Sequence, residues 1–255
     1  MKWFLLIVLF ISYTNVSAEC SVDSGEKRIS LLELYTSEGC SSCPPADKWL
    51  SQLEQNGFRN NQIVALAFHV DYWDYIGWKD RFAKAAFSER QRRAAFLQGS
   101  ATVYTPQFML NGADFRGWFR NRRLQDNISI ANTKPAKDEL GLRLSSAGSA
   151  GMQLTTTIKT ANSRYMENSD IFIAIYEHQL TTQVKAGENH GRELSHDYVV
   201  RELYGPFKPN LANSKWQQET LIGREWLKRD AGIAAFVQNR NTGEVLQAAS
   251  LKICS

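Results

Sequence analysis

Two cysteines three positions apart are the residues of this chain best suited to chemistry. Cys40 and Cys43 lie in the stretch T-S-E-G-C-S-S-C-P-P-A-D, residues 36–47. An apolar run of strand length, residues 29–35, comes before them, and two prolines follow directly. Proline is tolerated in the first turn of a helix, because the N–H groups there lack partners anyway. The spacing therefore predicts that the pair lies between a strand and a helix N-terminus.

A thiolate at that position has a lowered pKa, because it faces unpaired backbone N–H groups and the positive end of the helix dipole. Cys40 would be the nucleophile of such a site and Cys43 the resolving thiol, while Ser41 and Ser42 could donate hydrogen bonds to sulfur. Structural disulfides and metal-binding knuckles use the same spacing. Redox exchange, a structural disulfide and metal binding are therefore all open at this point.

The elements that must position the cysteines alternate between helix and strand patterns. The apolar run at 63–70 is of the kind expected for a strand covered on both faces. Together with the strand at 29–35 and the helix that starts at 44, it predicts a βαβ unit. A charged helix at about 79–97, a strand within 103–112 that enters through Thr105-Pro106, and a helix at about 114–131 complete a predicted α/β domain over residues 27–132.

The composition changes at residues 132–137. Beyond them, short segments such as M-Q-L-T-T-T-I-K-T alternate between apolar and polar residues, as half-buried antiparallel strands do. Glycine and asparagine stand at the joints between these segments. Strands are expected at 140–145, 152–160, 171–178, 198–203, 216–222, 233–239 and 245–253. Seven short strands predict a β-sandwich over residues 138–253.

The stretches L-L-E-L-Y-T-S-E-G-C-S-S-C-P-P and V-Y-T-P-Q-F-M-L-N-G together resemble the thioredoxin superfamily. The resemblance implies an N-terminal thioredoxin-like domain in which Pro106 is cis and lies against the disulfide, with Thr105 offering backbone contacts to a bound thiol partner. It matches Glu33 to a buried acid that exchanges a proton with the resolving thiol. The alternative for Glu33 is a salt-bridged or edge-exposed glutamate. The expected fold is thus a thioredoxin-like α/β domain followed by an antiparallel β-sandwich domain.

Four ordered motifs narrow the resemblance. The cysteine stretch, F-H-V-D-Y-W-D-Y-I-G-W-K-D, Y-T-P-Q-F-M-L-N-G and G-E-N-H-G-R-E-L-S-H-D-Y-V-V-R-E-L are similar to the secreted bacterial family labelled domain of unknown function 1223. The resemblance covers nearly the whole chain after residue 18. That family is grouped with thioredoxin-like proteins and brings no settled activity, so it bears on fold more than on function.

The first eighteen residues are predicted to be a secretory signal peptide. They start with Lys2, continue with an apolar run at 3–13 and end with the small residue Ala18. That run is too short to span a bilayer comfortably, so no membrane span is expected in the mature chain. The protein is expected to be exported to the periplasm or beyond, where disulfides persist. Cys20 and Cys254 lie at the two ends of the mature chain, so the economical pairing joins Cys20 to Cys254 and Cys40 to Cys43. The alternative is two separate free thiols.

Three further features are ambiguous in the sequence. The aromatic segment 69–78 either shapes a groove beside the cysteines or packs onto the core. His69 is either a ligand that joins the cysteines on copper or a hydrogen-bonded anchor. The segment 187–201, which holds His190 and His196, is a contact surface toward the first domain, a second polar site or a solvated loop.

The charge of the chain excludes one class of partner. The formal net charge is only +4, and basic residues form no stripe with interleaved aromatics, so no nucleic acid is expected. The leading hypothesis is an exported thiol/disulfide oxidoreductase that acts on protein or small-molecule thiols and disulfides without an organic cofactor or a metal. The alternatives are a carrier of copper or another metal that uses the same cysteines, and a non-enzymatic binding module with a structural disulfide. The sequence leaves the oligomeric state open.

Overall fold

The computed structural model describes residues 19–136, 138–160, 166–209 and 215–254. The predicted signal peptide, residues 1–18, lies outside the described residues. Within those ranges the chain forms three α-helices and three β-sheets. The helices are α1 (Pro44–Ser51), α2 (Ala85–Leu97) and α3 (Asn121–Asn132). No helix in this part of the chain has the length and apolar character needed to cross a bilayer.

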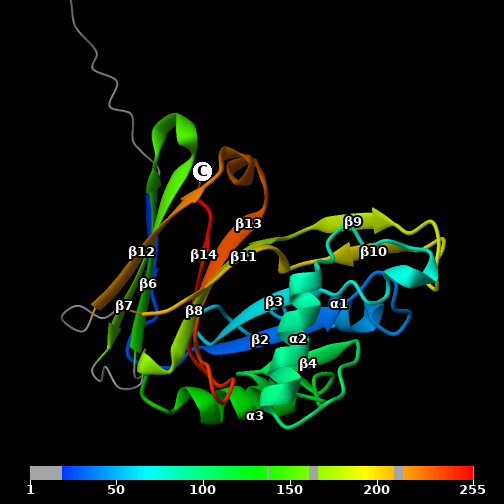
Figure 1. Cartoon of the computed structure of the whole chain (residues 1–255), viewed down its shortest axis with the longest axis horizontal. Coiled ribbons are helices and arrows are strands. Elements are labelled where there is room, and N and C mark those ends of the chain that lie inside the picture. Colours follow the sequence, from blue (N-terminus) through cyan, green and yellow to red (C-terminus); the bar gives the residue numbers. More distant parts are fainter. Residues whose placement is uncertain (1–18, 137, 161–165, 210–214, 255) are drawn as a thin grey trace, which may run out of the picture.

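The largest sheet has eight strands and draws on both halves of the chain (Figure 1). Its central pair, β2 (Ser30–Thr36) and β3 (Ile63–His69), is parallel, and every residue of both strands is buried. The strand order is β14-β13-β8-β11-β3-β2-β4-β5. The remaining bounds are β4 (Gln107–Leu110), β5 (Ala113–Asp114), β8 (Ser169–Glu177), β11 (Val199–Phe207), β13 (Ala231–Asn239) and β14 (Val245–Lys252).

The two faces of this sheet are covered by different helices. Side chains alternate along a strand, so Glu33 and Thr36 of β2 point to opposite faces. Thr36 contacts Asp47 of α1, and Glu33 contacts Arg90 of α2. The α1 side is therefore the side on which the chain places the cysteines.

A smaller sheet has four strands in the order β1-β6-β7-β12. Its bounds are β1 (Cys20–Asp23), β6 (Asp138–Ser146), β7 (Met152–Thr160) and β12 (Lys215–Ile222). Alternate residues of β7 are buried. Leu154 of β7 and Leu142 of β6 belong to a second hydrophobic core, where they meet Ile173 and Ile233 of the large sheet. Packing between the two sheets thus gives this part of the molecule its sandwich character.

The third sheet is a hairpin of β9 (Leu180–Gln183) and β10 (Glu193–His196). It extends beyond the end of β8, and β10 lies against α1 (Figure 1). The sequence patterns predicted neither strand of this hairpin, since each is only four residues long. The hairpin brings residues of the second half to the cysteine side of the large sheet.

The expected fold class, a thioredoxin-like α/β domain followed by a β-sandwich domain, is wrong. The chain is mostly β, and the strands of the first half are not a sheet of their own. β11 joins β3 in parallel, and the Ala67 N–H donates to the carbonyl of Tyr198 at 2.8 Å. A local pattern could not reveal this, because the partner of the β3 edge is a strand more than a hundred residues away. The boundaries 27–132 and 138–253 stay a prediction about folding units.

The two predicted disulfides are both present. Cys20 in β1 is bonded to Cys254 just after β14, and Cys40 is bonded to Cys43. The first bridge joins the small sheet to the edge strand of the large one. The two ends of the described chain are thereby held together.

Candidate functional site

The Cys40–Cys43 disulfide lies at the N-terminus of α1, as the sequence predicted. The first turn is anchored on Cys43, whose carbonyl accepts from the N–H groups of Ala46 and Asp47 at 2.8 and 3.1 Å. The Sγ atom of Cys40 lies 3.3 Å from the hydroxyl oxygen of Ser42. Ser41 and Ser42 are exposed, whereas both cysteines are 0% exposed. The disulfide is thus close to the surface but shielded from it.

Much of that shielding comes from the segment 184–192, which connects β9 to β10. The side-chain amide of the buried Asn189 donates to the carbonyl oxygens of Glu38 and Cys40 at 2.9 and 3.0 Å. The Glu188 carboxylate accepts from the Ser41 N–H at 3.1 Å, and the Ser41 hydroxyl and N–H together lower the pKa of Glu188. Of the interpretations open for residues 187–201, the structure supports a contact surface toward the first half of the chain.

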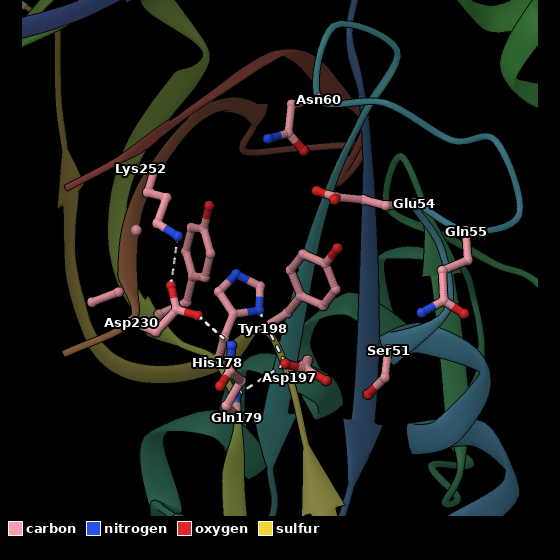
Figure 2. A pocket seen from close by; sticks show the side chains of 13 residues that line it. Ser51, Glu54, Gln55, Asn60, His178, Gln179, Asp197, Tyr198, Asp230 and Lys252 are labelled. Carbon is pink, nitrogen blue, oxygen red and sulfur yellow. Dashed lines mark hydrogen bonds and ion pairs between the residues drawn. The ribbon is translucent and has the colours of Figure 1, made fainter. Parts of the chain in front are cut away.

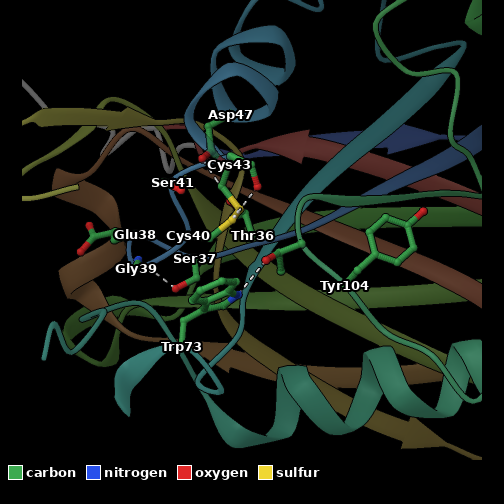
Figure 3. The surroundings of a disulfide bond; sticks show 12 residues. Thr36, Ser37, Glu38, Gly39, Cys40, Ser41, Cys43, Asp47, Trp73 and Tyr104 are labelled. Carbon is green, nitrogen blue, oxygen red and sulfur yellow. Dashed lines mark hydrogen bonds between the residues drawn. A yellow bond between two sulfur atoms is a disulfide. The ribbon is translucent and has the colours of Figure 1, made fainter. Parts of the chain in front are cut away.

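The aromatic segment also borders the disulfide. Figure 3 shows Trp73 beside the cysteines, with its indole N–H donating to the Thr105 hydroxyl at 2.7 Å. A Cβ at Gly39 would lie 3.1 Å from Cβ of Trp73, so glycine lets the cysteine turn and Trp73 approach closely. The Thr105–Pro106 peptide bond is cis, as the sequence resemblance implied. Trp73 therefore links the cysteine turn to the Thr105–Pro106 turn.

Glu33 is not brought to the disulfide. It is buried on the α2 side of the sheet, where Nε of Arg90 donates to its carboxylate at 2.7 Å and the Tyr35 hydroxyl lies at 3.3 Å. Burial and the neighbouring Glu33 raise the pKa of Tyr35 well above its ordinary value. Of the two interpretations for Glu33, the salt-bridged glutamate describes its surroundings.

Asp47 is a buried acid on the cysteine side of the sheet, next to Cys43 on α1. It follows Cys43 by four residues in the first turn of α1, which puts both on one face of the helix (Figure 3). The Thr36 hydroxyl donates to Oδ2 of Asp47 at 3.1 Å. The four-residue spacing was the signal that could have identified Asp47 from the sequence.

A cluster of buried polar side chains lies next to Asp47. We call Asp47, His69 and His196 the histidine–aspartate cluster, because one nitrogen or oxygen atom from each side chain lies within 4.8 Å of the other two. Nδ1 of His69 is 2.6 Å from Oδ2 of Asp80. The rings of His69 and His196 meet edge to face at 4.9 Å between centroids. His69 thus lies with His196 and Asp47, and the cysteines that were its predicted co-ligands are bonded to each other.

Two carboxylates surround His196. Its Nε2 lies 3.6 Å from Oε1 of Glu38, and its Nδ1 lies 3.8 Å from Oδ1 of Asp47. Burial lowers the pKa of His196, but Asp47 and Glu38 outweigh burial and raise it to about 10. For Asp80, burial raises the pKa, but His69 and the N–H groups of Glu38 and Phe82 outweigh burial and bring the pKa below its ordinary value. The cysteine side of the sheet therefore holds a concentrated buried charge network.

The sequence analysis missed Asp80, Glu38 and the pairing of the two histidines. Glu38 stands two residues before Cys40, and Asp80 ends the aromatic motif. His196 is separated from His69 by more than a hundred residues, so no local spacing joins them. The G-E-N-H-G-R-E-L-S-H motif was a signal, because it places His196 and Asn189 in one short segment.

A second polar pocket, of about 340 Å³, lies between the two halves of the chain. Figure 2 shows His178 and Asp197 turned toward each other, with Asp230 and Lys252 paired nearby. Nδ1 of His178 is 3.2 Å from Asp197, and Lys252 is 2.9 Å from Asp230. Burial raises the pKa of Asp197, but His178 and the Gln179 N–H outweigh burial and lower it to about 2. His178 and Lys252 thus already have carboxylate partners within this pocket.

Two solved structures resemble this fold. A protein of Agrobacterium tumefaciens has a TM-score of 0.62 at 25% sequence identity, and the match covers 88% of this chain and 93% of that one. HBP35 of Porphyromonas gingivalis has a TM-score of 0.64 at 16% identity over 89% of this chain and 76% of that one, a likeness of fold alone. A search of curated proteins finds no match. The model of the family described as "Protein of unknown function (DUF1223)" matches residues 31–238.

Proposed function

The chain belongs to the family Protein of unknown function (DUF1223), whose name assigns no activity, and we propose from the site itself that the protein exchanges thiols and disulfides at Cys40 and Cys43. One observation carries the proposal: the disulfide joins cysteines three positions apart directly at the start of α1, beside the buried carboxyl group of Asp47. Helix N-terminal N–H groups stabilise a thiolate. A disulfide in that position is easier to open and close than one between two strands.

The exchange runs in two steps. In the reduced protein, the Cys40 thiolate attacks one sulfur of a substrate disulfide, a mixed disulfide forms, and the other substrate sulfur leaves as a thiolate. Cys43 then loses its proton and attacks Sγ of Cys40, which releases the second substrate thiolate and leaves Cys40–Cys43 oxidised. Two electrons pass to the substrate. The same steps in reverse let the Cys40–Cys43 disulfide oxidise a substrate dithiol.

Asp47 takes the role that the sequence resemblance gave to Glu33. Its carboxyl group lies one helical turn from Cys43, on the same side of the sheet, and it is buried. A carboxylate so placed accepts the proton that Cys43 gives up before it attacks. Thr105 and Pro106 are proposed to contact the substrate chain, and the hydrogen bond from Trp73 to Thr105, which links their turn to the aromatic segment, supports this.

Access of the substrate requires the segment 184–192 to move, because Asn189 holds it over Cys40. Exposed Ser41 and Ser42 mark the side from which a substrate arrives. The substrates proposed are protein or small-molecule thiols and disulfides. No organic cofactor takes part, because the two thiols and the substrate balance the reaction.

Export forms part of the proposal. Residues 1–18 have the pattern of a signal peptide, and two disulfides suit a compartment where thiols oxidise. Cell fractionation followed by N-terminal sequencing checks it, and a chain that starts at Glu19 in the exported fraction is expected.

The function is tested by a redox titration of the purified protein, with the thiols identified by mass spectrometry. We expect the Cys40–Cys43 pair to be half-reduced at a potential well above about −300 mV, because structural disulfides that resist reduction have potentials below that value. Cys40→Ser should abolish the transfer of electrons to a model disulfide. A potential below about −300 mV would show that this bridge is structural, and the exchange reaction would have to be abandoned.

A further inference from the structure

We infer that the histidine–aspartate cluster is a binding site for a divalent transition-metal ion of the Zn²⁺ type, held by Nε2 of His69, Nδ1 of His196 and Oδ1 of Asp47. The site uses neither cysteine and does not rest on the proposed thiol exchange, although it shares Asp47 with that mechanism. Its donors come from three distant parts of the chain, namely the end of β3, the end of β10 and the first turn of α1. Only the folded chain therefore assembles it.

Three buried ring nitrogens of the two histidines make no hydrogen bond within the described part of the chain. They are Nε2 of His69 and both ring nitrogens of His196, and the two side chains are 0% and 2% exposed. A buried polar group without a hydrogen bond destabilises the folded state. Three such nitrogens within one cluster are expensive, and a metal ion at their centre satisfies two of them at once.

The arrangement of the outer partners is a further argument for the site. A metal-binding histidine usually donates its other N–H to a carboxylate, which fixes the ring and leaves the ligating nitrogen unprotonated. Asp80 lies 2.6 Å from Nδ1 of His69, so Nε2 has the free lone pair. Glu38 stands 3.6 Å from Nε2 of His196, so Nδ1 is the nitrogen turned toward Asp47. Thr36 likewise orients Asp47 by donating to Oδ2.

The region around the cluster contains an excess of buried carboxyl groups. Glu38, Asp47 and Asp80 are three carboxyl groups in one buried region, each less than 6% exposed. When ionised they carry three negative charges, which a single imidazolium balances only in part. Buried charges need close compensation. A divalent cation supplies it without the need for a protonated histidine.

The donor set selects the class of metal. Two imidazoles and one carboxylate suit Zn²⁺ and its first-row neighbours and are a poor set for Ca²⁺ or Mg²⁺, which prefer oxygen ligands. Ligands about 2.0 to 2.1 Å from a tetrahedral ion lie about 3.3 Å apart. The three donor atoms lie within 4.8 Å of one another, so inward shifts of about 1 Å by each side chain bring them to this spacing. Three protein ligands leave a fourth position for water or a substrate group.

Binding of Co²⁺ alone tests this inference, because Co²⁺ occupies Zn²⁺ sites and absorbs visible light. We expect one Co²⁺ per chain in the chelator-treated protein, with d–d absorption that Zn²⁺ displaces. Asp47→Asn and His69→Asn should weaken binding by more than about 100-fold, beyond the effect of an outer partner, and Asp80→Asn by about 10- to 100-fold. Circular dichroism and thermal unfolding identify which variants fold. If His69→Asn does not fold, Asp47→Asn, which keeps the side-chain shape, decides the test.

Two controls separate this site from the others. His178→Asn removes a histidine that also pairs with a carboxylate but lies in the second pocket, so Co²⁺ binding should not change. Cys40→Ser/Cys43→Ser removes both thiols, and Co²⁺ binding should persist. Failure of the redox titration would leave these results untouched, so the two proposals stand or fall separately.

Three outcomes overturn the inference. One is the absence of stoichiometric Co²⁺ binding, which would leave a buried imidazolium between Glu38 and Asp47 as the whole account of the cluster. Another is binding that survives in Asp47→Asn and His69→Asn, because the ion then sits elsewhere on the protein. The third is binding lost on removal of the cysteines, which would assign the metal to the thiols.

Discussion

Single residues in this protein owe their roles to the face of the sheet on which they lie. Glu33 and Thr36 differ by three positions in β2, and this odd spacing sends their side chains to opposite faces. One meets Arg90 and the other meets Asp47. The carboxyl group beside the cysteines is therefore supplied by α1, and the one in the preceding strand belongs to the core.

Glu33→Gln should lower the free energy of unfolding by about 3 kcal/mol, because it leaves the Arg90 guanidinium, only 10% exposed, without its carboxylate. Urea unfolding measures this change. The rate at which dithiothreitol reduces Cys40–Cys43 in the folded protein should stay the same.

The double variant Glu33→Gln/Arg90→Met is the matched control. It replaces the buried charge with an apolar side chain among Phe68, Phe172 and Phe236, which surround the guanidinium, so much of the lost stability should return. Loss of thiol exchange at unchanged stability would instead restore a proton-transfer role for Glu33.

At the scale of elements, the β9–β10 hairpin and its connecting segment decide how accessible the disulfide is. The segment 184–192 packs over the cysteine turn through Asn189 and over the aromatic segment at Gly187, where an added Cβ would lie 3.2 Å from Trp78. Gly187 has a φ of +73°, which favours glycine. The segment thus fits closely and yet forms no part of a central strand.

Asn189→Ala should accelerate the reduction of Cys40–Cys43 by dithiothreitol about 10- to 30-fold. The substitution removes the two hydrogen bonds that tie the segment to Glu38 and Cys40, about 1 kcal/mol each, so the open form of the segment becomes more populated. The rate is followed by quenching with an alkylating reagent and mass spectrometry.

His190→Ala changes the exposed neighbour of Asn189 and should leave the reduction rate close to that of the wild type. An equal rate for Asn189→Ala and the wild type would mean that the segment does not limit access to the sulfur atoms.

At the scale of the whole molecule, one large sheet and one terminal disulfide unite the two halves of the chain. Among the described strands, β1 is an edge strand that pairs only with β6, through four residues, and Cys20 ties it to Cys254, two residues after β14. A bridge across a loop that long restricts the unfolded chain strongly. The disulfide compensates for the short pairing of the edge strand.

Cys20→Ser/Cys254→Ser should lower the free energy of unfolding by about 3 to 5 kcal/mol, the range expected from loss of a long-loop disulfide. Urea unfolding measures the loss, and hydrogen exchange should show β1 opening first. The redox potential of Cys40–Cys43 should not change, because the two bridges lie in different parts of the fold. A stability equal to that of the wild type would show that β1 is held by its strand pairing and packing alone.

The sequence by itself determined the local features of this protein. The apolar runs at 29–35 and 63–70, the prolines after Cys43 and the alternation in the second half predicted β2, β3, α1 and most later strands, because such patterns depend on near neighbours. The pairing of the four cysteines followed from their positions at the termini and in one short motif. Helix starts were less accurate: α2 begins at Ala85 and not near 79, since the carboxylate of Asp80 accepts from the N–H of Phe82, within the turn before the helix, and from the distant N–H of Glu38.

Only the tertiary structure decided how these elements combine. The joining of β3 to β11, the cover that Asn189 forms over Cys40 and the meeting of His69 with His196 all link residues more than a hundred positions apart. Strand-edge pairing and burial select such contacts from many that the same local patterns permit. The alternation of side chains already put Glu33 and Thr36 on opposite faces, but only the packing of α1 and α2 fixed which face holds the chemistry.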